Sequence, residues 1–371
     1  MKVVVTGADG FIGKNIRQRL IEQGETEVVS FTRRNHVREL PALLADADAV
    51  VHLAGINRPQ DLSEFHTGNV ELTHRLCEAV VAATSRGRKM VVIFSSSTQV
   101  EREGAYGSSK RAAETAVRTL APEKGVLVRI FRLPNVFGKW ARPNYNSVVA
   151  TFCYNATRNL PIVMHDPNAE ITLVHVDDVV RRMCAVLNGD IGNSETSIVE
   201  PEFKTTVADL ATAIRGFAAS RDALSVAEVG RGFWRALYAT YVSYLPPQSF
   251  SYAVPVYSDP RGVFVEMLKT SGSGQFSFFT ANPGATRGGH YHHTKTEKFL
   301  VLRGHARFRF RNILSGETCA LETSGDRPEI VDTIPGWSHD ITNIGDEQLY
   351  VMLWANEIFD RDRPDTFACP I

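Results

Sequence analysis

Residues 2–13 of the sequence, KVVVTGADGFIG, combine a short apolar run with three closely spaced glycines. The β-branched residues predict a buried strand over Lys2–Thr6, and the residues after the glycines predict a helix over Gly13–Gln23. At a turn of this kind, backbone N–H groups free of side chains can approach a diphosphate at the N-terminus of the helix. The stretch therefore predicts a dinucleotide-binding turn, with a simple tight turn as the alternative.

Short β-branched runs alternate with helical patterns as far as about residue 190. This alternation predicts an α/β fold whose N-terminal part is a Rossmann-like, doubly wound parallel sheet with crossover helices. The predicted strands are Lys2–Thr6, Glu27–Thr32, Ala49–Leu53, Met90–Ser95 and Leu127–Leu133, and the predicted helices are Gly13–Gln23, Val70–Ala83, Ser108–Leu120, Asp177–Leu187 and Val207–Ala219.

The pattern changes around residues 244–260, where prolines and polar residues predict a linker. Short strands separated by turns follow, which is typical of an antiparallel all-β barrel or sandwich. We therefore predict two domains, residues 1–245 and residues 246–371. The predicted strands of the second domain are Val263–Lys269, Gln275–Thr280, Lys298–Arg303, His305–Arg311 and Gln348–Trp354.

The charges are balanced, with 41 Lys plus Arg and 41 Asp plus Glu, so we expect no general attraction to nucleic acid or to an anionic membrane. No apolar run is long enough to span a bilayer, and no basic leader precedes the first strand. The five scattered cysteines fit reduced thiols. We therefore expect a cytoplasmic protein.

Two arginines, Arg33 and Arg34, follow the second predicted strand. An NAD site usually offers a carboxylate to the ribose hydroxyls at this place, whereas arginine favours a 2′-phosphate. The pair therefore predicts NADPH, with a solvated basic turn as the alternative.

A predicted strand over Val91–Phe94 leads into three serines, and the residues from Tyr106 onward predict a helix. Tyr106 and Lys110 lie four residues apart and so share a helix face. We expect the Lys110 ammonium, helped by an oxidised nicotinamide, to lower the pKa of the Tyr106 phenol, while a serine hydroxyl bonds the carbonyl oxygen of a substrate. A solvated helix face is the alternative reading of the Tyr–Lys pair.

Together these motifs resemble extended short-chain dehydrogenases/reductases that act on nucleotide sugars, over residues 1 to about 240. The resemblance also rests on Asn69, residues 132–138 (RLPNVFG) and residues 174–178 (VHVDD). It implies that Ser97, Tyr106 and Lys110 are catalytic, with Ser96 and Thr98 as alternatives to Ser97. It implies cofactor contacts from Gly7, Gly10, Phe11, Ile12, Gly13, Arg33, Arg34, Leu53, Ala54, Gly55, Tyr106 and Lys110.

The sequence departs from these relatives at two places. Sugar 4,6-dehydratases carry an Asp-Glu pair after the catalytic Ser/Thr, whereas Thr98-Gln99 follow Ser97 here. We therefore expect no dehydration. The stretch between Ser97 and Tyr106 is also shorter than in relatives, so residues of the substrate pocket are not transferred across it.

The C-terminal part contains His290, His292 and Glu297 between two glycines, and His339 follows a Pro-Gly pair. On a strand, His290 and His292 project to the same face, and a return strand can bring Glu297 to them. Three imidazoles and one carboxylate suit Zn²⁺, Fe²⁺, Mn²⁺ or Ni²⁺. We therefore predict a metal site, with a histidine-rich surface hairpin as the alternative.

These spacings resemble the two-part signature of cupins, except that Ile334-Pro335-Gly336 changes the position of the usual proline. His293 lies outside the pattern. The segment from Asp259 to Glu266 also resembles sugar-nucleotide 3,5-epimerases, which share the cupin barrel. Tyr291 and Lys298 are candidates, by proximity alone, for a base in this barrel.

Over the whole chain the sequence resembles bifunctional enzymes of capsular polysaccharide synthesis. The resemblance implies that a UDP-2-acetamido-2,6-dideoxy-hexos-4-ulose is inverted at C3 by the zinc-binding cupin. It implies further that the reductase then uses NADPH to reduce C4, which would give UDP-2-acetamido-2,6-dideoxy-L-talose on the way to UDP-N-acetyl-L-fucosamine. It also implies a homodimer. One alternative is a single-activity reductase or 4-epimerase with a structural cupin, and another is a non-enzymatic NADPH-sensing regulator.

Overall fold

The computed structural model describes residues 1–24, 26–85, 87–121, 123, 125–190, 194–250, 252–313, 315–362 and 364–371. The chain forms two compact units. The first contains Met1–Ile214 and Ala236–Pro246, and the second contains Arg215–Arg235 and Pro247–Ile371. The domain division after residue 245 stays a prediction.

The first unit is built on a parallel sheet with the strand order β2-β1-β3-β4-β5-β8. Its central strands are buried on both faces, which is why they are nearly continuous apolar runs. Because the strands are parallel, the carboxyl ends of neighbouring strands meet at one edge of the sheet. The strands are β1 (Lys2–Thr6), β2 (Glu27–Phe31), β3 (Ala49–His52), β4 (Met90–Ser97), β5 (Val126–Leu133) and β8 (Thr196–Ser197).

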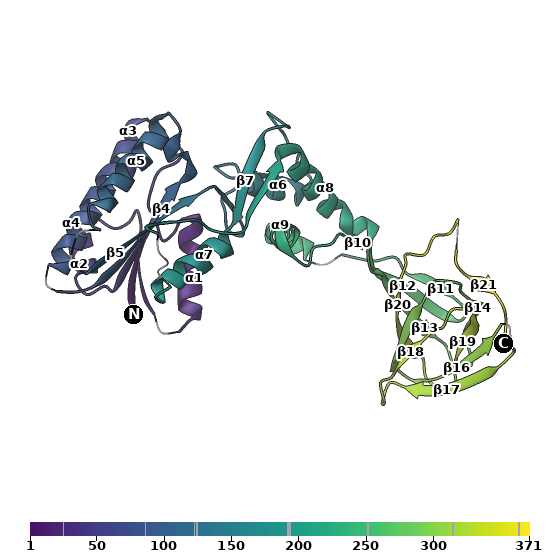
Figure 1. Cartoon of the computed structure of the whole chain (residues 1–371). Coiled ribbons are helices and arrows are strands. Elements are labelled where there is room, and N and C mark those ends of the chain that lie inside the picture. Colours follow the sequence, from purple (N-terminus) through teal and green to yellow (C-terminus); the bar gives the residue numbers. More distant parts are fainter. Residues whose placement is uncertain are drawn as a thin grey trace. The chain divides into compact units, whose positions relative to one another are not determined.

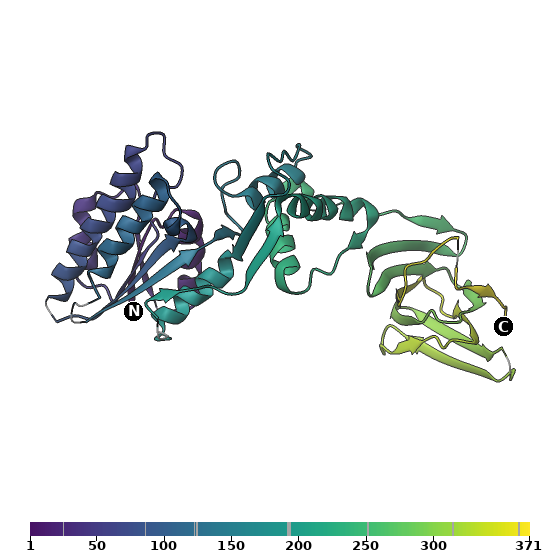
Figure 2. The same ribbon diagram turned by 45° about the horizontal axis from the view of Figure 1, so that its top comes forward.

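Helices cover both faces of this sheet (Figure 1 and Figure 2). On one face α1 packs beside α7, and on the other α4 contacts both α2 and α5. Each face has its own apolar core. The predicted doubly wound α/β fold is confirmed. The helices are α1 (Phe11–Glu22), α2 (Leu40–Leu44), α3 (Ser63–Phe65), α4 (Leu72–Thr84), α5 (Ala105–Arg118) and α7 (Val176–Leu187), with a π-helical turn at His66–Glu71 and 3-10 turns at Val37–Glu39 and Thr98–Glu101.

A small mixed sheet has the order β6-β7-β9. It comprises β6 (Asn135–Phe137), β7 (Glu170–His175) and β9 (Glu202–Thr206), and the neighbouring helices along the chain are α6 (Val148–Ala156), α8 (Val207–Ala223) and α9 (Gly232–Val242), followed by a 3-10 turn at Pro247–Ser249. Among the described residues, no helix combines the length and apolar character needed to cross a bilayer.

The second unit consists mainly of two β-sheets around an apolar core. Aromatic rings from both sheets meet in that core, such as Phe299 and Phe308 with ring centroids 5.7 Å apart. The predicted all-β C-terminal architecture is confirmed. One sheet contains β10 (Ser225–Val226), β11 (Tyr257–Asp259), β12 (Gly262–Thr270), β13 (Gly274–Ala281), β15 (Glu297–Arg303), β18 (Ile330–Asp332) and β20 (Leu349–Ala355), and the other contains β14 (Thr286–Tyr291), β16 (His305–Asn312), β17 (Thr318–Ser324), β19 (Trp337–Asn343) and β21 (Phe367–Ala368).

Candidate active sites

The predicted glycine turn lies between β1 and α1 and packs against the residues after β3. Gly7 has a φ of +66°, and a Cβ on it would stand 2.7 Å from the backbone nitrogen of Ala54. A Cβ on Gly13 would stand 2.2 Å from the carbonyl oxygen of Gly7. The Gly10 N–H donates to that same oxygen at 2.9 Å, which closes the turn. Side chains would therefore push apart the strand end and the first turn of the helix.

The other predicted cofactor contacts lie beside this turn. Phe11 and Ile12 pack against the core between the sheet and α7, and so anchor the start of α1. Leu53 and Ala54 donate backbone N–H groups to the Thr6 hydroxyl, both at 3.2 Å. The structure thus brings the glycine turn and the end of β3 together.

Arg33 and Arg34 lie in an exposed turn directly after β2. Thr32 and Asn35 fix this turn, because the Thr32 N–H donates to the Asn35 side-chain oxygen at 2.9 Å. Phe31 is the register partner of Thr6, so the turn is at the same sheet edge as the glycines. Neither guanidinium forms an ion pair with a carboxylate of the described residues. Both can therefore approach an anion.

Ser97, Tyr106 and Lys110 come together where β4 ends and α5 begins. Ser97 is the last residue of β4, and its hydroxyl interacts with the Tyr106 phenol. Lys110 is 7% exposed, and its ammonium donates to the Ser95 carbonyl oxygen at 2.7 Å and lies 4.7 Å from the centre of the Phe94 ring. The three predicted catalytic residues are thus neighbours in one site.

The pKa of Tyr106 differs from the expectation. Burial raises the pKa of this phenol, and the hydrogen bond with Ser97 lowers it by less than burial raises it. Lys110 is not among the causes of this shift, and its predicted action on the phenol together with an oxidised nicotinamide stays a prediction. Burial lowers the pKa of Lys110 to about 8, while the carboxylate of Glu114 acts against this shift. Tyr106 is therefore protonated at neutral pH, as a proton donor must be.

Asn69 connects the segment after β3 with α5. Its side-chain oxygen accepts from the Ile56 N–H at 2.7 Å, and its side-chain nitrogen donates to the Ser109 hydroxyl at 3.0 Å. A Cβ on Gly55 would stand 2.9 Å from the same oxygen, so a side chain there would displace Asn69. The sequence motif that contains Asn69 indicates no role for this residue. The structure shows that it holds the two walls of the site together.

His52, which sequence reasoning missed, lies fully buried beneath the site. Its Nδ1 contacts the Thr6 hydroxyl at 2.6 Å and its Nε2 contacts the Thr73 hydroxyl at 3.0 Å. The Thr73 hydroxyl donates to the Asn69 carbonyl oxygen at 2.6 Å, so it accepts from His52, and Thr6 donates to Nδ1. Burial, together with the charge of Lys110, lowers the pKa of His52 to about 3. His52 is therefore neutral.

A buried carboxylate lies one helical turn beyond Lys110. Glu114 is 2% exposed and accepts two hydrogen bonds from Arg132, at 3.0 and 2.8 Å. Burial alone would raise the pKa of Glu114, but the bonds from Arg132 hold it below its usual value. This pair joins α5 to β5 and was not predicted.

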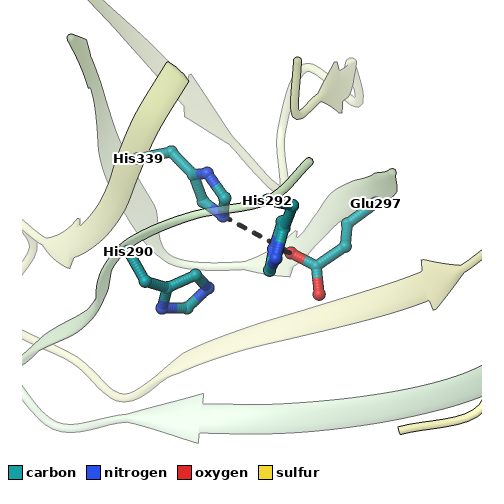
Figure 3. A group of neighbouring side chains, drawn as sticks. All are labelled: His290, His292, Glu297 and His339. Atoms are coloured by element: carbon teal, nitrogen blue, oxygen red, sulfur yellow. Dashed lines mark hydrogen bonds and ion pairs between the residues drawn. The ribbon is translucent and has the colours of Figure 1, made fainter. Parts of the chain in front are cut away.

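The four predicted metal ligands form one cluster in the second unit, shown in Figure 3. Their ligand atoms all lie within 4.8 Å of one another. His292, Glu297 and His339 are buried, and His290 is half-buried. The residues of the cluster are therefore close enough to share one ion.

Backbone irregularities direct these side chains. A β-bulge lies between Gly288 and His290 where β14 pairs with β19, and it leaves His290 opposite His339. A Cβ on Gly288, whose φ is +95°, would stand 2.8 Å from the His339 carbonyl oxygen. The strand ends at Tyr291, so His292 is in the following loop and not on the strand as expected.

The donor set fits a divalent metal. Nε2 of His292 and Nε2 of His339 each lie 3.4 Å from Glu297 Oε2. Nε2 of His339 is buried and forms no hydrogen bond of regular geometry with the residues that the structure describes. Burial and the neighbouring imidazoles lower the pKa of His290 to about 4, so it is neutral at pH 7, as a metal ligand must be. Burial raises the pKa of Glu297, but His292, His339 and Lys295 together hold it well below its usual value.

Two residues beside the cluster were missed. The Lys295 ammonium, on a residue only 8% exposed, lies 2.9 Å from Glu297 Oε1. Asp365, near the C-terminus, accepts hydrogen bonds from the loop that follows His292. The sequence around these residues does not indicate their roles. Lys295 is one lysine in a polar loop, and Asp365 is 68 or more positions away from His290, His292 and Glu297.

The candidate bases named from the sequence have other contacts. Tyr291 stacks on Phe367 with ring centroids 5.3 Å apart. The exposed Lys298 pairs with Asp332 at 2.5 Å on the neighbouring strand. Packing and ion pairing therefore account for both side chains.

Family models match both parts of the chain. Residues 3–198 match the NAD dependent epimerase/dehydratase family, and residues 257–367 match the polysaccharide biosynthesis C-terminal domain. A protein of Pseudomonas aeruginosa named UDP-2-acetamido-2,6-beta-L-arabino-hexul-4-ose reductase is 56% identical over 100% of this chain and 99% of its own.

Solved structures agree. Capsular polysaccharide assembling protein CapF from Staphylococcus aureus matches with a TM-score of 0.92 and 38% identity, covering 100% of both chains. UDP-glucuronic acid 4-epimerase from Bacillus cereus, solved with UDP-glucuronic acid and NAD, matches 66% of this chain and 99% of its own with a TM-score of 0.55. At 20% identity the latter shows the fold alone. The chain belongs to the NAD dependent epimerase/dehydratase family and, over its whole length, to the CapF family of capsular polysaccharide proteins.

Proposed function

We propose that this chain is a bifunctional nucleotide-sugar enzyme that treats one ketone at two sites. The second unit inverts C3 of a UDP-2-acetamido-2,6-dideoxy-hexos-4-ulose, and the first reduces the C4 ketone with NADPH. The product is UDP-2-acetamido-2,6-dideoxy-L-talose, a precursor of N-acetyl-L-fucosamine in capsule or O-antigen. The name of the Pseudomonas relative supports the reduction and the substrate class.

In the reductase site, Tyr106 gives its proton to the C4 oxygen while Ser97 donates a hydrogen bond to the same atom. NADPH, when bound along the glycine turn, supplies the hydride. The buried positive charge of Lys110 stabilises the phenolate that proton transfer leaves on Tyr106. The absence of an Asp-Glu pair after Ser97 argues against dehydration.

The order of epimerisation before reduction follows from the chemistry of the ketone. A proton at C3 is acidic only while C4 is a carbonyl, so inversion must precede reduction. His290, His292, Glu297 and His339 would hold a divalent metal, which would supply Lewis-acid polarisation of a carbonyl oxygen. Zn²⁺ suits this nitrogen-rich set, and other divalent metals can replace it.

The observation that supports this function most is the metal cluster itself. A cupin that holds no metal needs no cluster of three imidazoles and one carboxylate with ligand atoms within 4.8 Å of one another, whereas a metal centre does. The close approach of Ser97 and Tyr106 argues likewise against a regulator that has lost its chemistry.

The test is incubation of the purified chain with UDP-4-keto sugars, NADPH and Zn²⁺, with the product's stereochemistry read by NMR. We expect an inverted C3 and a hydroxyl at C4. A product that is reduced at C4 but keeps the original configuration at C3 would refute the epimerase and indicate a single-activity reductase. No consumption of NADPH with any of these sugars would refute the enzyme.

A further inference from the structure

The last residues of the chain contact the loop and strands that carry the metal cluster. We call Asp365–Pro370 the C-terminal clamp. It is joined to β14 through β21, in which Ala368 is the register partner of His290. These contacts link the end of the chain to ligands 26 or more positions earlier.

The carboxylate of Asp365 holds the loop between His292 and Glu297. It accepts from the backbone N–H groups of His293, Thr294 and Lys295, at 2.9, 2.7 and 2.8 Å. The Thr294 hydroxyl donates to the same carboxylate at 3.0 Å. Three successive N–H groups around one carboxylate form a rigid arrangement, because each bond is charge-assisted.

The backbone of Asp365 fixes the ring of His292. Its carbonyl oxygen accepts a short hydrogen bond from Nδ1 of His292, which places the proton on that nitrogen. Nε2 is then unprotonated and faces Glu297, 3.4 Å away. A hydrogen bond from the far ring nitrogen to a carbonyl is the usual way in which proteins orient a metal-binding histidine.

Further along, the clamp reaches the other two histidines. The Cys369 N–H donates to the Gly289 carbonyl oxygen at 2.8 Å, next to His290. The Ser338 hydroxyl donates to the Cys369 carbonyl oxygen, next to His339. Arg311 anchors the end of the clamp through the Pro370 carbonyl oxygen at 2.8 Å.

We propose that the C-terminal clamp is a positioning element of the metal site, and that Asp365 is its main anchor. The clamp holds the loop and the ring of His292 in the binding geometry before a metal arrives. Asp365 touches no reacting atom, so it acts through His292. This inference rests on the metal site of the proposed function.

The experiment measures binding of Zn²⁺ and Co²⁺ to the full chain and its Asp365→Asn variant. Affinity is obtained by competition with a chromophoric chelator, and the Co²⁺ form is followed by its visible absorption. Loss of such an outer contact typically weakens metal affinity about 10- to 100-fold, and we expect this range. Asp362→Asn is the matched control, because Asp362 is an exposed acid of the same tail. It should stay within about twofold of the parent affinity.

A second variant protects the test against a folding defect. Thr294→Val removes one donor to Asp365 from the loop side, and we expect about three- to tenfold weaker binding. In the metal-free protein, Asp365→Asn should also speed hydrogen exchange at the amides of residues 293–295, while the amides of β4 exchange as in the parent chain.

The outcomes separate the two proposals. If the parent chain binds one ion and both variants keep its metal affinity and its hydrogen exchange in the loop, the role of the clamp is overturned and the metal site stands. A parent chain that binds no ion, or that binds it equally well as His290→Ala, would overturn the metal site and the clamp with it.

Discussion

The Lys110 ammonium donates a hydrogen bond to the carbonyl oxygen of Ser95 at 2.7 Å. This bond holds the charge near the end of β4, two residues before Ser97. Lysine and tyrosine therefore have opposite shifts: burial lowers the pKa of Lys110 to about 8 and raises that of Tyr106. The site keeps a protonated phenol beside a lysine that can lose its proton in mildly alkaline solution.

The first prediction concerns pH. Below about pH 8 Lys110 is charged, and above it the ammonium deprotonates, whereas Tyr106 stays protonated. We expect kcat/KM for ketone reduction to fall as pH rises through about 8. The Lys110→Arg variant keeps a positive charge at all these pH values, so its remaining kcat/KM should not fall as pH rises through about 8. Stopped-flow NADPH oxidation across pH 6–10 measures both profiles, and identical profiles would contradict the assignment to Lys110.

The second prediction concerns the buried ion pair. Glu114→Gln removes the charged partner of Arg132, and we expect the free energy of unfolding to fall by about 2–3 kcal/mol. Because the pKa of Glu114 is lowered in the fold, its stabilisation is present above its ordinary pKa and lost as pH falls through the lower folded value. The difference between the two proteins should therefore shrink in acid.

Glu101→Gln is the control for this pair. Glu101 also contacts Arg132, at 3.1 Å, but its side chain is 78% exposed. Urea unfolding should show almost no change for it. Equal losses for both glutamates would mean that burial does not decide the strength of these contacts.

The third prediction tests the glycine turn. In Gly13→Ala the new Cβ meets the Gly7 carbonyl oxygen, so we expect a loss of about 1–3 kcal/mol and weaker NADPH binding. Gly216→Ala is the matched change, because Gly216 lies within α8 with open space around it, and there alanine should add up to about 1 kcal/mol. Calorimetry and NADPH titration distinguish the two. Similar behaviour of the variants would refute the close approach.

The fourth prediction tests cofactor choice. Replacing Arg33 and Arg34 together by alanine should lower kcat/KM with NADPH about 10- to 100-fold and leave the value with NADH nearly unchanged, because only NADPH has the 2′-phosphate. Initial rates with both cofactors measure this. A parent enzyme that uses the two equally well would remove the reason for the prediction.

Much of the fold could be predicted from the sequence because it depends on local patterns. The apolar runs of β1 and β3 directly predict buried strands. The glycines of the turn predict that the following helix packs close to the end of β1. β17 was missed, because five of its seven residues are exposed and show no alternation.

The metal ligands could be predicted because their spacing is itself the signal. The bulge at Gly288, the place of His292 beyond the strand and the bonds from Asp365 depend on pairing between distant segments. Glu114 and Arg132 likewise meet only once α5 has packed on β5. No local pattern contains such contacts.

The most direct test of the two-site account follows solvent deuterium into the substrate. With a UDP-2-acetamido-2,6-dideoxy-hexos-4-ulose in D₂O, Tyr106→Phe should stop NADPH oxidation while deuterium still enters C3. His290→Ala should stop exchange at C3 while NADPH is still oxidised. Exchange at C3 that survives loss of His290 would contradict the account, because inversion would then not depend on the metal cluster.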